Sequence, residues 1–466
     1  MTEGMAVAKV LTLGGLDPDR IGRALNHPEH LRNVGVVAEL LRRMDRAGHD
    51  PRLLFNFQTN LFQASYRAQQ ADADIGRALG RLDDGKGPDW MGQHDAPKMT
   101  YLAPTWTPVC APDSRDRAEW EMERVVARRV VRQLQDVGDG LAWRVYRYDR
   151  REIVALADHP SAGPVVNKSG LDHELGWVVD RFRDSGEFTL LHDLTTVLRH
   201  HDFTEVDANG YRVLREVKAN PTTGNARAKL SKQRRQAEVA LAAAAGTAPL
   251  GDGGTRLVRS GQQLRTHVRD LSGVMTVARR DGYVVTRVHD RIVGVLYLPT
   301  IAAAEADRDL RDVYDAYCGR LNATLDRCLP STVPRLHARI GFTEPRNAFF
   351  APYSIYPLPV NQRTALICDL AIVDTFMNPD RLCRGFEDLG LTVEYLIGSG
   401  SPPDADVLRV DNGHARATLH ARAVSQLLFE FVQTDCFVRA FAASLDSPAD
   451  ITQAILTFSN EKGAWR

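Results

Sequence analysis

Apolar residues recur three and four positions apart along much of the chain, which is the spacing of one face of an α-helix. This pattern predicts that residues 1–100 are mostly helical and that a long helix follows over 115–136. It also predicts helices over 171–183 and 187–199. The last prediction rests on a stripe of apolar positions, which are Leu190, Leu191, Leu194, Val197 and Leu198.

Alternation of apolar and polar residues has the period of a β-strand instead. It predicts strand structure over 141–157 and a hairpin with strands at 283–288 and 291–298. Residues 301–466 mix both patterns, with a strongly helical stretch over 415–445. The chain is therefore predicted to combine helices and sheets in an α/β arrangement.

A second, tighter hairpin is predicted between His200 and Asn220. An Asn-Gly pair near its centre supplies the positive φ angles that a tight turn needs. The side-chain period of two places Glu216 and Lys218 on one face at the end of the second strand. Antiparallel pairing then brings Asp202, at the start of the first strand, close to Glu216. Two carboxylates and an ammonium group would meet at one edge of a small sheet.

The segment after this hairpin predicts a basic helix, capped by Asn225 and running to about Ala243. Its cations are Arg227, Lys229, Lys232, Arg234 and Arg235. Glu238 is the acid among them, so the segment has a net charge of 5 − 1 = +4. Such a helix suits a phosphate backbone, and a solvated helix face is the alternative. A short strand over 255–259 is predicted next.

Composition limits the kinds of protein that this chain can be. Its 466 residues allow about three domains, and 44% hydrophobic content supports packed cores. Lys plus Arg and Asp plus Glu both total 59, so a nucleic-acid partner would need a local basic patch. The six cysteines include no Cys-x-x-Cys pair, which argues against a zinc ribbon or a disulfide framework and fits a reducing compartment.

Hydropathy along the chain bears on its location. No apolar run approaches the ~20 residues of a membrane span. The apolar stretch near the N-terminus is too short for a secretory signal. We therefore expect a cytoplasmic protein without a membrane partner.

The arrangement of Asp202 with Glu216-Val217-Lys218 resembles the PD-(D/E)XK nuclease superfamily, which has the restriction-endonuclease-like fold. In that family an Asp opens one strand and an acid-x-Lys tripeptide closes the paired strand. The following helix often carries a Gln and basic residues, and here it reads K-L-S-K-Q-R-R-Q, with Gln233 in the middle. This chain departs from the pattern at His201, because a Pro often stands before the Asp.

The resemblance covers about residues 170–260 and implies a restriction-endonuclease-like core, a mixed sheet flanked by helices. We assign this core to a nuclease-like domain over 111–300, between a mostly helical N-terminal region (1–110) and a mixed α+β C-terminal domain (301–466). Many family members carry a further acid on the helix before the hairpin. Glu174 and Glu187 both compete for that role, and the sequence leaves the choice open.

The resemblance also implies an activity, the metal-dependent hydrolysis of phosphodiester bonds. The carboxylates of Asp202 and Glu216 and the carbonyl of Val217 would hold Mg²⁺ or Mn²⁺, which prefer oxygen ligands. Lys218 would orient or deprotonate the attacking water, and Gln233 would position the water or a phosphate. We expect an endonuclease that acts on DNA in preference to RNA, in a bacterial antiviral-defence or mobile-element context. A homo-oligomer or a partner subunit stays open.

Other interpretations of the same residues exist. An acid-x-Lys tripeptide is common in a chain with 25% charged residues, and Asp84-Gly85-Lys86 is another example, in a Gly-rich loop. The hairpin could belong to a non-catalytic nucleic-acid-binding scaffold, or be incidental in a phage or assembly structural protein. His192, His200 and His201 could suggest a transition-metal site, although the last two are better explained as flanking the strand.

Overall fold

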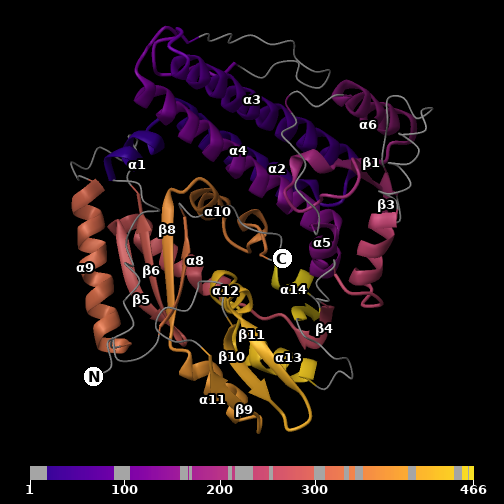
Figure 1. The fold of residues 1–466 in the computed structure, drawn as a ribbon, viewed down its shortest axis with the longest axis vertical. Coiled ribbons are helices and arrows are strands. Elements are labelled where there is room, and N and C mark those ends of the chain that lie inside the picture. Colours follow the sequence, from indigo (N-terminus) through magenta and orange to yellow (C-terminus); the bar gives the residue numbers. More distant parts are fainter. Residues whose placement is uncertain are drawn as a thin grey trace.

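The computed structural model describes most of the chain, namely residues 18–88, 105–157, 166, 170–207, 212–215, 235–250, 256–298, 310–329, 335–341, 350–396, 406–445, 454–459 and 461–465. Within these ranges the protein is a mixed α/β structure with several small sheets (Figure 1). The boundaries drawn at residues 110 and 300 stay a prediction.

The N-terminal part is helical, as predicted, and comprises α1 (Pro18–Leu25), α2 (Pro28–Ala47), α3 (Pro51–Asp83) and α4 (Arg117–Val145). The last three lie side by side along their length (Figure 1). Asp50 caps α3, because its side chain accepts hydrogen bonds from the first backbone amides of that helix. The helix predicted over 115–136 is confirmed and extends further, to Val145.

The strand predicted over 141–157 is wrong. That stretch contains the end of α4 and a short helix, α5 (Arg150–Ala157). Residues 153–157 are all buried in α5. A helix that is surrounded on every side buries consecutive residues, so its apolar positions lose the period of 3.6 that would reveal it.

The predicted hairpin around Asp202 is confirmed as far as the structure describes it, and it belongs to a three-stranded antiparallel sheet. The preceding helix is α6 (Leu171–Ser185), and the strands are β1 (Phe188–Leu191), β2 (Phe203–Val206) and β3 (Arg212–Arg215). The helix predicted over 187–199 is wrong, because this segment forms β1 and the 3₁₀-helix η1 (His192–Leu194). All four residues of β1 are buried, and such a strand has a continuous apolar run that resembles a helical stripe.

After the region of the basic helix, β4 (Arg256–Gln263) confirms the strand predicted over 255–259 and is longer. It pairs in parallel with β12 (Ala454–Ser459), near the far end of the sequence. A short helix, α14 (Glu461–Ala464), follows β12. The pairing joins segments about two hundred positions apart, which no local pattern could predict.

The hairpin predicted over 283–298 is confirmed as part of a four-stranded antiparallel sheet. In spatial order its strands are β5 (Tyr283–Val288), β6 (Arg291–Tyr297), β8 (Ala371–Met377) and β7 (Leu336–Ile340). Two helices cover its opposite faces, α8 (Val268–Asp281) and α9 (Leu310–Cys328) (Figure 1). Alternate residues of β6 accordingly pack into two different apolar clusters.

The remaining elements are α10 (Val360–Ile367), α11 (Asp380–Glu387), β9 (Thr392–Tyr395), β10 (Asp406–Asp411), β11 (Arg416–His420), α12 (Ala421–Phe429), α13 (Thr434–Leu445) and the 3₁₀-helix η3 (Tyr353–Ile355). The stretch predicted as helical over 415–445 therefore begins with a strand. In the described part of the chain no helix is both long and apolar enough to cross a membrane.

Candidate functional site

Asp202 directly precedes β2 and continues its backbone pairing by one residue. It lies at the edge of the sheet where the sequence predicts the catalytic residues. Its backbone N–H donates to the carbonyl of Arg215 over 3.0 Å, and its carbonyl accepts from the N–H of His192 over 3.0 Å. His201, directly before it, has a left-handed backbone with φ 64°, which is uncommon for a residue with a Cβ atom. Asp202 itself is 8% exposed. Its backbone is therefore held from both neighbouring segments.

The register of the hairpin agrees with the predicted pairing as far as it is described. Phe203 lies opposite Arg215, which is the last described residue of β3. Four residues with a predicted catalytic or metal-binding role lie outside the described part of the chain. They are Glu216, Val217, Lys218 and Gln233. The meeting of the two carboxylates therefore stays a prediction.

The position of α6 distinguishes Glu174 from Glu187, the two candidates for the further acid. Two residues join α6 to β1, whose first residue pairs with the far end of β2, so Glu187 lies at the end of the sheet away from Asp202. There it pairs with Arg181 over 2.6 Å. At the near end, Trp177 of α6 stacks on Phe203 with ring centroids 4.7 Å apart. Glu174, one helical turn before Trp177, is buried with 5% exposure.

A buried hydrogen-bonded chain lies beside Asp202. His192 Nδ1 is 2.7 Å from the carbonyl oxygen of His200, and Nε2 is 2.7 Å from Thr204 Oγ1. Burial lowers the pKa of His192 to about 3, so the ring is neutral. Since a carbonyl only accepts, Nδ1 carries the proton and Nε2 accepts from Thr204. Tyr146 then donates to Thr204 over 2.8 Å.

The hydrogen bonds of this network give His192 a positioning role. Both of its ring nitrogens are engaged within the protein, so neither offers a lone pair to a metal ion while the network is intact. Through its ring and its backbone, His192 holds the residues on both sides of His201. The sequence alone left a metal-ligand role open, because no sequence pattern indicates that the carbonyl of His200 and the hydroxyl of Thr204 engage both ring nitrogens.

The cations described near the sheet are paired with acids. Arg212 of β3 contacts Glu152 at 2.7 Å and lies over the ring of Tyr146, 4.7 Å from its centroid. Arg215 contacts Glu205 at 3.2 Å. These pairs hold β3 against α5 and β2, and their charges are largely neutralised.

The predicted basic helix is described from residue 235, and residues 235–244 are helical. Arg235 is exposed there, while Arg227, Lys229, Lys232 and Arg234 lie outside the described residues. The helix ends close to the predicted Ala243, and Gly246 follows it with φ 78°. Its inward face consists of alanines, whereas Leu241 is 45% exposed.

Sequence analysis missed the residue that protects the outer edge of the sheet. The side-chain amide of Gln58 in α3 donates to the carbonyl of Thr189 over 2.8 Å and accepts from the N–H of Leu191 over 2.9 Å. Gln58 thus satisfies backbone groups of β1 in place of another strand. No sequence signal points to it, because 131 positions separate it from Thr189.

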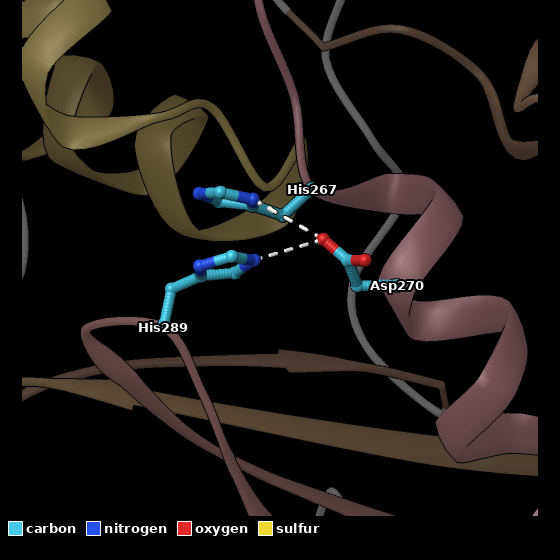
Figure 2. A group of neighbouring side chains, drawn as sticks. All are labelled: His267, Asp270 and His289. Atoms are coloured by element: carbon cyan, nitrogen blue, oxygen red, sulfur yellow. Dashed lines mark hydrogen bonds and ion pairs between the residues drawn. The ribbon is translucent and has the colours of Figure 1, made fainter.

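A second group of metal-ligand residue types lies elsewhere, at the start of α8. It consists of His267, Asp270 and His289 (Figure 2). In the sequence, His289 falls between the two predicted strands at 283–288 and 291–298 and has no predicted role. The spacing His-x-x-Asp at a helix start was a weak signal, since the third residue comes from a separate hairpin.

Comparisons of the chain with protein-family models, with curated proteins and with solved structures found no match. The function must therefore be argued from the residues and their arrangement.

Proposed function

We propose that the protein is a metal-dependent nuclease that hydrolyses phosphodiester bonds, with DNA as the preferred substrate. The observation that carries this proposal is the position of Asp202. It stands at the end of β2, and its backbone bonds to Arg215, the residue directly before the Glu216-Val217-Lys218 tripeptide. The order of helix, hairpin, helix and strand that the resemblance implies further supports a restriction-endonuclease-like core.

The available donors suit a hard divalent cation. Carboxylate and carbonyl oxygens are the ligands that Mg²⁺ and Mn²⁺ prefer, and Asp202, Glu216 and the carbonyl of Val217 would supply them. When bound, such an ion stabilises charge on the scissile phosphate and lowers the pKa of a coordinated water. Glu174 is buried one helical turn before Trp177, which stacks on Phe203, and this supports its choice as the further acid over Glu187.

The chain's own residues would divide the remaining work. Lys218 would orient the attacking water or accept its proton as the new P–O bond forms and the bond to the leaving oxygen breaks. Gln233 would position the water or a phosphate oxygen. His192 would hold the backbone around Asp202 without entering the chemistry.

The test is cleavage of supercoiled plasmid, single-stranded DNA and RNA by the purified full chain, with Mg²⁺, Mn²⁺ or EDTA. We expect metal-dependent cutting of DNA that falls by roughly 10²–10³-fold in Asp202→Asn, Glu216→Gln and Lys218→Met. Asp207→Asn, just beyond the other end of β2, is the control and should cut normally. Thermal unfolding must show that each variant is folded.

A matched pair of variants tests the further acid. Glu174→Gln should lose most of the cutting, whereas Glu187→Gln should keep it and lose only an ion pair with Arg181. Equal activity of wild type, Asp202→Asn and Lys218→Met would overturn the site. Metal-independent DNA binding without any cutting would instead favour a nucleic-acid-binding scaffold, and an absence of both would favour a structural protein.

A further inference from the structure

His267, Asp270 and His289 converge from separate elements at one surface position. His267 is the residue before α8, and Asp270 lies in the first turn of that helix. His289 comes from the turn between β5 and β6 and has φ 53°, a left-handed conformation that is uncommon for histidine. Figure 2 shows both imidazole rings directed at the carboxylate of Asp270.

The distances match those between ligands of one ion. Asp270 Oδ2 lies 3.0 Å from His289 Nε2 and 3.3 Å from His267 Nδ1. Donors that bind one ion at about 2.0–2.1 Å stand about 2.9–3.4 Å apart at octahedral or tetrahedral angles. One ligand atom from each residue lies within 4.8 Å of the other two. The three ligand atoms therefore lie close enough together to surround one ion.

The local charge also suits a cation. The imidazole rings stack with centroids 3.8 Å apart, so both lie on the same side of the Asp270 carboxylate. The cation Arg291 has its own partner in Asp290, at 3.6 Å, so the charge of Asp270 remains for the cluster.

The cluster is anchored on one side and open on the other. The backbone N–H of His267 donates to the carbonyl of Phe431 over 2.7 Å, and Arg287 donates to the carbonyl of His289 over 2.9 Å. The side chain of His267 is 12% exposed, whereas those of Asp270 and His289 are 52% and 53% exposed. An ion could therefore enter from solvent and keep water in its remaining positions.

We propose that His267, Asp270 and His289 form a binding site for a divalent first-row transition metal, with Zn²⁺ as the expected ion. Two imidazoles and one carboxylate form a softer donor set than the oxygens at Asp202, so the two sites would take different metals. The bound ion would link the start of α8 to the β5–β6 turn.

The test is a calorimetric titration of the chelator-treated full chain with Zn²⁺, repeated with His289→Ala and Asp270→Asn. We expect one tight site in the wild type and an affinity at least ~10-fold lower in each variant, since even residues that only orient ligands cost about this much. His414→Ala is the matched control. It removes an exposed histidine near β11 and should leave the affinity unchanged.

Co²⁺ spectroscopy tests which residues bind, because Cys328 is also exposed. The proposal expects visible d–d bands without a thiolate charge-transfer band, and loss of these bands in His289→Ala. Equal Zn²⁺ affinity in all four proteins, or a thiolate band that persists in His289→Ala, would overturn it. Because the altered side chains are half-exposed, the metal-free variants should unfold at the wild-type temperature, which separates loss of a ligand from loss of the fold.

Discussion

Two antiparallel sheets of this protein each bury an aspartate, and they use it differently. Asp374 lies in the middle of β8, where it accepts hydrogen bonds from His337, Arg339 and Tyr317 at 2.7–3.0 Å. Asp202 instead stands at the end of its sheet, with its backbone held by neighbouring segments. An acid inside a strand is surrounded by fixed partners, whereas an acid at a sheet end lies where loops and ligands can reach it.

The hydrogen-bond partners of Asp374 stabilise it as a buried, ionised carboxylate within the fold. Burial alone would raise its pKa, but hydrogen bonds and charge from His337 and Arg339 outweigh burial and the pKa is lowered. Gly294 of β6 pairs with Asp374 across the sheet and makes room for Tyr317, because a Cβ atom at position 294 would lie 2.5 Å from the tyrosine oxygen. Burial is common to both aspartates, so it is the place along the strand that distinguishes Asp202, the catalytic acid of the proposed function, from Asp374.

The strongest test of this comparison is the variant Asp374→Asn. It should lower the free energy of unfolding by about 3 kcal/mol, because Arg339 would remain buried without its carboxylate. Urea unfolding measures the change. The control Asp326→Asn breaks an exposed pair with Arg335 and should cost under ~1 kcal/mol. Asp202→Asn should show the reverse profile, with lost cleavage and a smaller loss of stability, and a larger loss than Asp374→Asn would break the comparison.

A third buried acid extends the comparison to pH. Asp139 of α4 accepts from the backbone and hydroxyl of Thr196, yet burial raises its pKa to about 7. In the unfolded chain an Asp titrates near 3.9, so the folded state holds the extra proton between about pH 4 and 7. Stability should therefore fall as pH rises through this window, by up to ~1.4 kcal/mol per pH unit.

Asp139→Asn removes the titrating group and should flatten this part of the pH profile, measured by urea unfolding at several pH values. Asp172→Asn, at the start of α6, provides the matched control at an exposed acid. An unchanged slope in Asp139→Asn would show that the carboxyl is ionised in the folded protein.

The smallest expected effect concerns the basic helix after the hairpin. Replacement of Lys232, Arg234 and Arg235 with Ala should reduce the salt dependence of DNA binding by up to ~3 units of log–log slope if all three contact phosphates. Fluorescence anisotropy at several salt concentrations measures this. Replacement of Arg42, Arg43 and Arg46, which are exposed on α2 and grouped around Glu39, should leave the slope unchanged. An unchanged slope in the first variant would remove that helix from the interface.

Local sequence predicted those elements whose signals act over a few residues. The alternation on both sides of the Asn-Gly pair predicted β2 and β3. These predictions succeeded because the side-chain period of a strand depends on neighbouring residues alone. The same rules failed at 141–157 and 187–199, where burial on all sides hid the period.

Only the tertiary structure decided which distant residues meet. Arg150 of α5 is fully buried and pairs with Glu430 at 2.8 Å and with Glu461 at 3.1 Å, residues almost three hundred positions or more away. The tertiary structure likewise determines the pairing of β4 with β12 and the contact of His289 with Asp270. The sequence by itself determined the hairpin and its acid at Asp202, because short-range geometry is encoded locally. The placement of Glu187 at the sheet end away from Asp202 and the histidine cluster required the fold, since packing brings together residues that no spacing connects.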